Sequence, residues 1–143
     1  RNAESLTYQT ASNIDTAVGT MVGKVRSENI NSQRNIITIG TTGYSYINTG
    51  RPSTAWRGYD GTNIVEKTGL DDITTGIRTR VVSWGGAGLK VTGNGLTPAS
   101  GAFDGAFGNG TSIEVGKDLG GYVGDIAIYN YQMTDAELQA LTT

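Results

Sequence analysis

Residues 77–95 read IRTRVVSWGGAGLKVTGNG, and this stretch decides the fold class. Its first part, 77–84, is rich in β-branched and aromatic side chains and stops at the glycines of 85–88. The chain then resumes as Leu89-Lys90-Val91-Thr92. Two short β-forming runs joined by a glycine-rich connection are typical of an antiparallel hairpin. No helical pattern follows the glycines, so the loop lacks the strand-to-helix exit of a phosphate-binding motif.

Similar runs recur about every ten residues, which is typical of a β-sandwich or jelly roll. Bounded by Gly, Asn, Asp or Ser, further strands are expected at 6–8, 19–26, 35–40, 44–48, 56–59, 64–67, 112–116 and 122–129. Asp60-Gly61 predicts a hairpin turn between two of them. The segment 96–110 is expected to be a loop in which Phe103 and Phe107 plug the core.

The last element is different in kind. Thr134-Asp135-Ala136-Glu137 has the pattern of a capping box, and Leu138 and Leu141 follow at helical spacing. We therefore predict an all-β, two-sheet antiparallel jelly-roll sandwich with one short C-terminal helix, and a single domain over 1–143. Arg1 is not an initiator Met, which is consistent with a fragment that lacks upstream sequence.

Composition excludes several classes of function. The chain has 22 Gly, and Gly, Thr, Ser and Asn together make 61 of its 143 residues, which suits many tight turns. With no Cys and no His, Ser-His-Asp hydrolysis, Cys-His proteolysis and His-based zinc chemistry are ruled out. The net charge of −2 gives no basic field for nucleic acid, and Arg51, Arg57, Arg78 and Arg80 are expected to form a scattered polar face. No apolar run approaches the roughly 20 residues of a membrane-spanning helix, so membrane insertion is not expected.

The C-terminal residues resemble a known family. Residues 121–138, GYVGDIAIYNYQMTDAEL, are similar to the closing strand and helical turn of concanavalin A-like, laminin-G-like jelly-roll domains, with Met133 where Leu is usual. The hairpin at 81–95 and the strand at 19–25 resemble the same family. The resemblance implies a lectin- or adhesion-type sandwich, without enzymatic activity where the family's glucanase motif is absent.

That glucanase motif is not found here. A retaining glycosidase needs two carboxyl groups about 5–5.5 Å apart, supplied in this family by glutamates alternating on one strand. The chain has only five Glu, at positions 4, 28, 66, 114 and 137, and no two of them lie within four residues. We therefore expect no enzymatic activity.

Two groups of side chains are candidates for binding a saccharide. Trp56, Tyr59, Asp60 and Asn63 surround a predicted turn, and sugars bind through aromatic ring faces combined with polar groups that hold their hydroxyls. The alternative is that Trp56 is a core residue and Asp60 only forms the turn.

Tyr44 and Tyr46 are the second candidate group. They lie two apart and so share one strand face, either as a binding platform or as cross-strand packing. For Trp84, packing in the core is the expected role.

Calcium is the cofactor that the family resemblance raises. Asp71 and Asp72 form the one adjacent acidic pair, and Asp104 lies in the glycine-rich loop, so these three are the candidate ligands. None has the spaced oxygen pattern of a dedicated calcium loop, and surface solvation or turn capping is the alternative for each.

Two functions follow. The first is a non-enzymatic surface module that binds saccharide, or mediates adhesion, on a virion or cell surface. The alternative is a structural decoration or fibre domain of a bacteriophage particle, whose partners are capsid or tail proteins or further copies of the chain. Either function predicts an extracellular or virion-surface location. Exposed aromatics gathered in one concave patch would favour sugar binding, whereas a flat apolar face would favour a protein partner.

Overall fold

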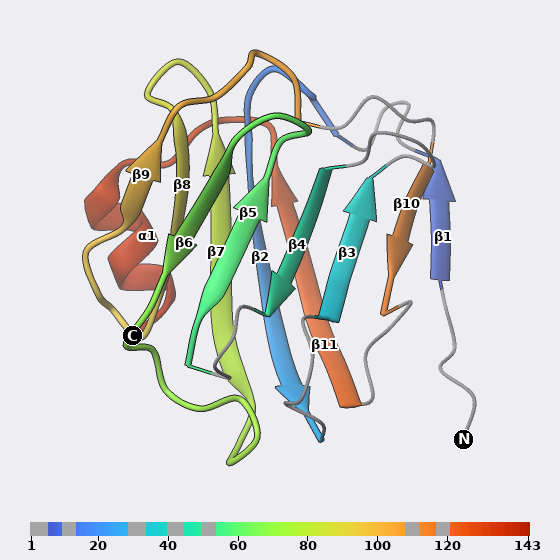
Figure 1. The fold of residues 1–143 in the computed structure, drawn as a ribbon, viewed down its shortest axis with the longest axis vertical. Coiled ribbons are helices and arrows are strands. Elements are labelled where there is room, and N and C mark those ends of the chain that lie inside the picture. The colour runs from blue at the N-terminus through green and yellow to red at the C-terminus, as the bar shows by residue number, and fades with distance from the viewer. Residues whose placement is uncertain are drawn as a thin grey trace.

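The computed structural model describes residues 6–9, 14–28, 34–39, 45–49, 54–107, 112–116 and 121–143. In this part of the chain, eleven strands and one short helix form a sandwich of two antiparallel sheets (Figure 1). The predicted all-β jelly-roll architecture is therefore confirmed.

Each sheet is built from strands that are distant in sequence. The six-stranded sheet has, in spatial order, β1 (Leu6–Gln9), β10 (Ser112–Val115), β3 (Arg34–Ile39), β4 (Ser45–Thr49), β5 (Trp56–Tyr59) and β6 (Ile64–Lys67). The five-stranded sheet has β11 (Gly121–Tyr129), β2 (Gly19–Ser27), β7 (Arg78–Trp84), β8 (Leu89–Gly93) and β9 (Ala99–Gly101). The hairpin predicted at 77–95 is β7–β8. β9 lies where a loop is predicted, because these three residues pair with the edge of β8.

Trp84, at the end of β7, is fully buried in the core. Its ring stacks on Phe107 with centroids 4.5 Å apart and an interplanar angle of 16°. Its indole Nε1 donates to the carbonyl oxygen of Asp15 over 3.0 Å. A buried indole N–H needs such an acceptor, and this bond fastens the segment before β2 to the core. The predicted packing role of Trp84 and the plug role of Phe107 are both confirmed.

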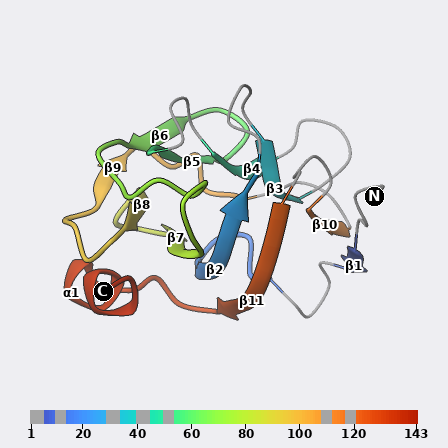
Figure 2. The same ribbon diagram turned by 90° about the horizontal axis from the view of Figure 1, so that it is seen from below.

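The helix α1 (Asp135–Leu141) covers part of the outer face of the five-stranded sheet (Figure 2). Leu138 and Met133 pack there against Val81, with Val22 and Tyr129 at the margin of this second cluster. The capping box is present as predicted, because Thr134 Oγ1 accepts from the Glu137 amide while the Glu137 carboxylate accepts from the Thr134 amide. No helix in the described residues is long and apolar enough to cross a membrane.

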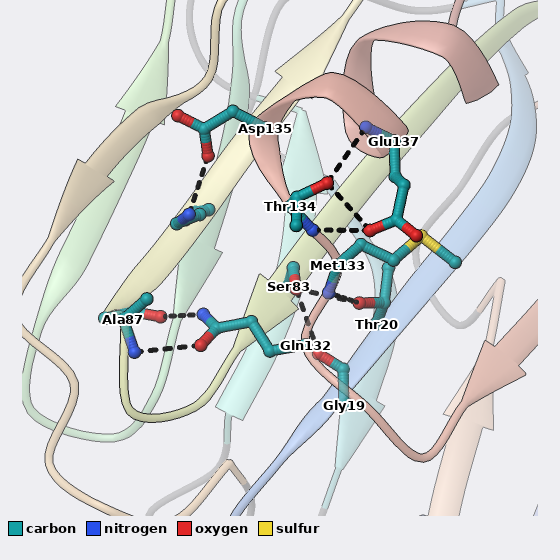
Figure 3. A network of polar contacts seen from close by, with 11 residues as sticks. Gly19, Thr20, Ser83, Ala87, Gln132, Met133, Thr134, Asp135 and Glu137 are labelled. Carbon is teal, nitrogen blue, oxygen red and sulfur yellow. Dashed lines mark hydrogen bonds and ion pairs between the residues drawn. The ribbon is translucent and has the colours of Figure 1, made fainter.

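A buried polar network fixes the linker between β11 and α1 (Figure 3). The hydroxyls of Thr20 and Ser83 lie 2.7 Å apart, and Thr20 Oγ1 also accepts from the amide of Met133 over 3.1 Å. Gln132 binds the tip of the β7–β8 hairpin, because its side chain accepts from the Ala87 amide and donates to the Gly88 carbonyl. Because buried polar groups are costly when unpaired, this network stabilises the observed position of the linker.

Arg80 is buried, although the sequence predicts it in a scattered polar face. Its side chain is 1% exposed, and the guanidinium donates to the backbone oxygens of Asp71 and Thr79 and to Asn94 Oδ1. Burial lowers the pKa of Arg80 to about 10, although the carboxylate of Asp71 opposes the shift. The arginine therefore remains charged at neutral pH and ties the loop before β7 to the turn after β8.

Substitution of Gly19 tests the packing around Trp84. A Cβ atom at this position would lie 2.5 Å from Cζ2 and 2.9 Å from Cε2 of the Trp84 ring. We expect G19A to lower the free energy of unfolding by about 1–3 kcal/mol, the usual cost of overpacking a core. Gly86 is the matched control, because a Cβ atom there has no neighbour within 4 Å. Urea unfolding of the two variants measures the difference, and equal losses would contradict the packing described for Trp84.

Candidate functional site

The β5–β6 hairpin turns at Asp60-Gly61, as the sequence predicts. Gly61 has φ +107°, in the region that favours glycine, and the Asp60 amide donates to the Asn63 carbonyl oxygen over 3.2 Å. Asp60 Oδ1 accepts from the amides of Thr62 at 2.9 Å and Asn63 at 2.6 Å. The aspartate therefore acts as the Asx residue of the turn.

The second carboxylate oxygen of Asp60 connects this hairpin to a distant loop. Oδ2 accepts from Asn63 Nδ2 at 3.1 Å and from the backbone amide of Asp104 at 3.0 Å. Burial alone would raise the pKa of Asp60, but the hydrogen bonds from Asn63, Thr62 and Asp104 hold it below its ordinary value of 3.8. Since four donors from the chain itself occupy the buried carboxylate, Asp60 has the turn-forming role that was the alternative to sugar binding.

Trp56 requires a similar correction. The side chain is 2% exposed and belongs to the core cluster between the sheets, so its ring presents no face to solvent. Trp56 and Tyr59 are three residues apart on one strand, and successive side chains of a strand alternate between its faces. Tyr59 therefore lies on the opposite side, half-buried, where its hydroxyl donates to the carbonyl oxygen of Gly61.

The open face of this hairpin carries four side chains: Arg57, Tyr59, Ile64 and Glu66, which we call the β5–β6 face. Gly58 and Val65, between them in sequence, point into the core, so alternation places these four outward. The strand register pairs Tyr59 with Ile64 and Arg57 with Glu66. Ile64 is 54% exposed, which leaves an apolar surface beside the phenol ring.

Arg57 and Glu66 form the charged part of this face. Nε and Nη2 of Arg57 donate to the same oxygen, Glu66 Oε2, over 2.9 and 2.5 Å. The two side chains are 19% and 28% exposed, so the pair is partly desolvated and less screened than a surface ion pair. The contact does not use Arg57 Nη1 or Glu66 Oε1, and one donor and one acceptor atom therefore remain beside Tyr59.

From the sequence, Arg57 is expected only in a scattered polar face, and Glu66 is only one of five well-separated glutamates. Pairing the predicted strands 56–59 and 64–67 across the four residues between them sets Arg57 opposite Glu66, because the length of a hairpin connection fixes its register. Tyr46 of the second candidate pair has a backbone position opposite Tyr59 in the β4–β5 register. Tyr44 lies outside the described residues.

The three calcium candidates bind groups of the chain itself. Asp72 Oδ1 caps a turn by accepting from the amide and hydroxyl of Thr74, at 2.8 and 2.7 Å. Asp104 accepts from the Thr62 hydroxyl and the Ala106 amide, and Asp71 lies 3.7 Å from Arg78 Nε. Within the described ranges, no three Asp or Glu side chains gather in a way that could hold a metal ion.

A hollow of about 410 Å³ lies at the end of the sandwich, near the β7–β8 hairpin. Its walls are small and uncharged, and they comprise Ala17, Gly85, Gly86, Gly88, Ala102, Phe103 and Gly105. A sugar site needs polar side chains that hold hydroxyl groups, and these walls have none. The β5–β6 face, which combines an aromatic ring with an ion pair, is therefore the stronger candidate.

No protein-family model and no curated protein matches the sequence. Among solved structures, the chain is similar to the CBM40 module of the Ruminococcus gnavus IT-sialidase, with a TM-score of 0.75 and 15% identity over 100% of this chain and 97% of that one. The same module is also known bound to α2,3- and to α2,6-sialyllactose.

Two further structures share the fold. The leech intramolecular trans-sialidase matches with a TM-score of 0.72 and 16% identity over 99% of this chain, but over only 27% of the enzyme. A SAP-like pentraxin from Limulus polyphemus matches with a TM-score of 0.64 and 9% identity, over 90% of this chain and 70% of that one. The chain thus spans a whole CBM40 module but about a quarter of the leech enzyme, and these likenesses establish a lectin-type fold.

The Asp60 hydrogen bonds predict a pH-dependent stability. We expect D60N to lower the free energy of unfolding at pH 7 by about 1–3 kcal/mol, because a buried amide N–H loses its acceptor. Since the folded-state pKa lies below the unfolded value of 3.8, the wild-type advantage is present above that value. It is lost as the pH falls through the folded-state pKa.

Urea unfolding between pH 7 and pH 2.5 measures this difference. D125N, whose parent side chain is 85% exposed, is the control and should show little change at any pH. A wild-type advantage over D60N that stays constant to pH 2.5 would contradict the account of Asp60.

Metal removal should leave the fold intact. Because Asp71, Asp72 and Asp104 are engaged by the chain's own groups, we expect the same melting temperature in EDTA and in millimolar CaCl₂. Differential scanning calorimetry measures it. A fall in EDTA that CaCl₂ reverses would show that calcium contributes to the folded state.

Proposed function

We propose that this domain is a non-catalytic carbohydrate-binding module, and that its β5–β6 face binds a glycan ending in sialic acid. The observation that carries the proposal is the Arg57–Glu66 pair beside Tyr59 on the open side of the six-stranded sheet. Support also comes from the fold, because the sialyllactose-bound CBM40 structures match this chain over its whole length.

The chemistry of the face suits an acidic sugar. Sialic acid carries a carboxylate, and the planar guanidinium of Arg57 can donate to it through the nitrogen that Glu66 does not use. Glu66 Oε1 can accept from a sugar hydroxyl, and the apolar face of Tyr59 can pack against ring C–H groups. Because the net charge of the chain is −2, the attraction has to come from this local arginine and not from the overall field.

The two glutamates of the six-stranded sheet are too far apart to act as a glycosidase pair. Glu114 and Glu66 belong to β10 and β6, which are four strand spacings or about 19 Å apart in the sheet. Paired glycosidase carboxylates lie within about 5–9.5 Å. Some sialidases use a tyrosine nucleophile instead, but the hydroxyl of Tyr59 donates to a backbone carbonyl, which cannot act as a general base.

A surface-displayed setting, extracellular or on a virion, is part of this proposal because glycans of this kind are met outside cells. The bacteriophage decoration or fibre role, with capsid or tail proteins as partners, stays a prediction of the sequence, as do the laminin-G-like family assignment and a homo-oligomeric state.

Substitution of Arg57 tests the site. We expect R57A to weaken the binding of 3′-sialyllactose at least about tenfold, which corresponds to about 1.4 kcal/mol. R57K should lose much of the affinity as well, because an ammonium group keeps the charge but not the planar fork. Isothermal titration calorimetry measures both variants, and no hydrolysis of the ligand should accompany binding.

The matched control is R78A, which removes another arginine that lies beside a carboxylate. This variant should bind like the wild type. Wild-type affinity in both R57A and R57K would exclude the β5–β6 face as the sialoside site, and an absence of binding by the wild type would overturn the proposed ligand.

A further inference from the structure

The outer face of the five-stranded sheet is only partly covered. Helix α1 lies over the side of the sheet formed by β7 and β8 (Figure 2), where Leu138 packs with Val81. The outward side chains Lys24 and Arg26 of β2 are exposed. Tyr122 of β11 is 50% exposed and its backbone lies opposite Arg26 in the register. This half of the face thus presents an aromatic ring between charged groups.

A β-bulge shapes the neighbourhood of Tyr122. The β11–β2 register jumps between Val123 and Ile126, so Gly124 and Asp125 are both opposite the single residue Lys24. A Cβ atom at Gly124 would lie 2.7 Å from Cε1 and 3.0 Å from Cζ of Tyr122. The ring therefore leans along the strand and occupies the space that a side chain at position 124 would need. Bulges of this kind often re-aim side chains at functional sites.

Charged groups of both signs lie beside the ring. Lys24 Nζ lies 3.0 Å from Asp125 Oδ2, and the two side chains are 52% and 85% exposed. Arg26, the next outward residue of β2, lies opposite Tyr122 in the register. Lys24, Arg26 and Asp125 place hydrogen-bond donors and an acceptor next to one aromatic surface. Donors and acceptors beside an aromatic surface are the groups that the hydroxyls and the C–H face of a sugar require.

We propose that Lys24, Arg26, Tyr122 and Asp125 form a second saccharide site that binds a neutral pyranose. The apolar C–H face of the sugar would stack on the Tyr122 ring, and neighbouring hydroxyls would bond to the Lys24–Asp125 pair and to Arg26. The site lies on the other sheet from the β5–β6 face and does not rest on sialic acid binding there. Two sites on opposite faces would let one domain hold two parts of a branched glycan or two neighbouring chains.

A nuclear magnetic resonance titration of the ¹⁵N-labelled chain tests this site. The ligands are the neutral disaccharides lactose, cellobiose and maltose, and the readout is the set of amide shifts at 24–26 and 122–125. At least one disaccharide should shift these amides in a saturable way, with weak affinity. Y122A should weaken that binding about tenfold, and Y122F, which keeps the ring, should stay within about threefold.

Tyr131 provides the matched control, because it is 49% exposed but lies beyond the end of β11 and pairs edge-on with Tyr129. Y131A should bind like the wild type. The proposal is overturned if none of the three sugars shifts the 24–26 and 122–125 amides, or if Y122A binds as well as Y131A. Since the β5–β6 amides are read in the same spectra, failure of one site is distinguishable from failure of the other.

Discussion

The buried indole of Trp84 is the constraint on which the rest of the structure depends. It contacts Phe107 by stacking, binds the Asp15 carbonyl through its N–H, and leaves room only for glycine at position 19. Two segments that are far apart in sequence, 15–19 and the loop that ends at Phe107, are thereby fixed around the ring of Trp84. Phe107 belongs to the loop whose Asp104 amide donates to Asp60, so the same contacts lead from the core to the β5–β6 turn.

These contacts explain how the β5–β6 hairpin, at the edge of its sheet, holds its side chains in a defined arrangement. The carboxylate of Asp60 fixes the turn, and the turn fixes the register that sets Arg57 opposite Glu66. The ion pair then holds the guanidinium before any ligand arrives. A group that is already oriented loses less conformational entropy on binding, which suits a shallow face that has few contacts to offer.

Local signals in the sequence were sufficient for much of the fold. The β7–β8 hairpin, the Asp60-Gly61 turn and the capping box at Thr134 each depend on neighbouring residues and were predicted correctly. The burial of Arg80 was not predictable, because it depends on backbone oxygens supplied by the loop before β7 and on Asn94 after β8. The position of Tyr122 over Gly124 likewise follows from a bulge that no local pattern marks.

Only part of the candidate site could be predicted from local signals in the sequence. The hairpin and Tyr59 were identified from aromatic and turn residues, but Trp56 was grouped with them although alternation sends it to the other face. Alternation along the strand already implies that Trp56 and Tyr59 lie on opposite faces. Which of the two faces is buried could be known only from the position of the second sheet, whose Val82 and Val91 approach Gly58.

The most direct test of the central claim is a crystal structure of the domain soaked with 3′-sialyllactose. The account predicts density for the sugar on the β5–β6 face, with its carboxylate within hydrogen-bonding distance of Arg57 and its ring against Tyr59. Density for the ligand elsewhere, for example in the hollow beside the β7–β8 hairpin, with the β5–β6 face accessible and empty, would contradict it.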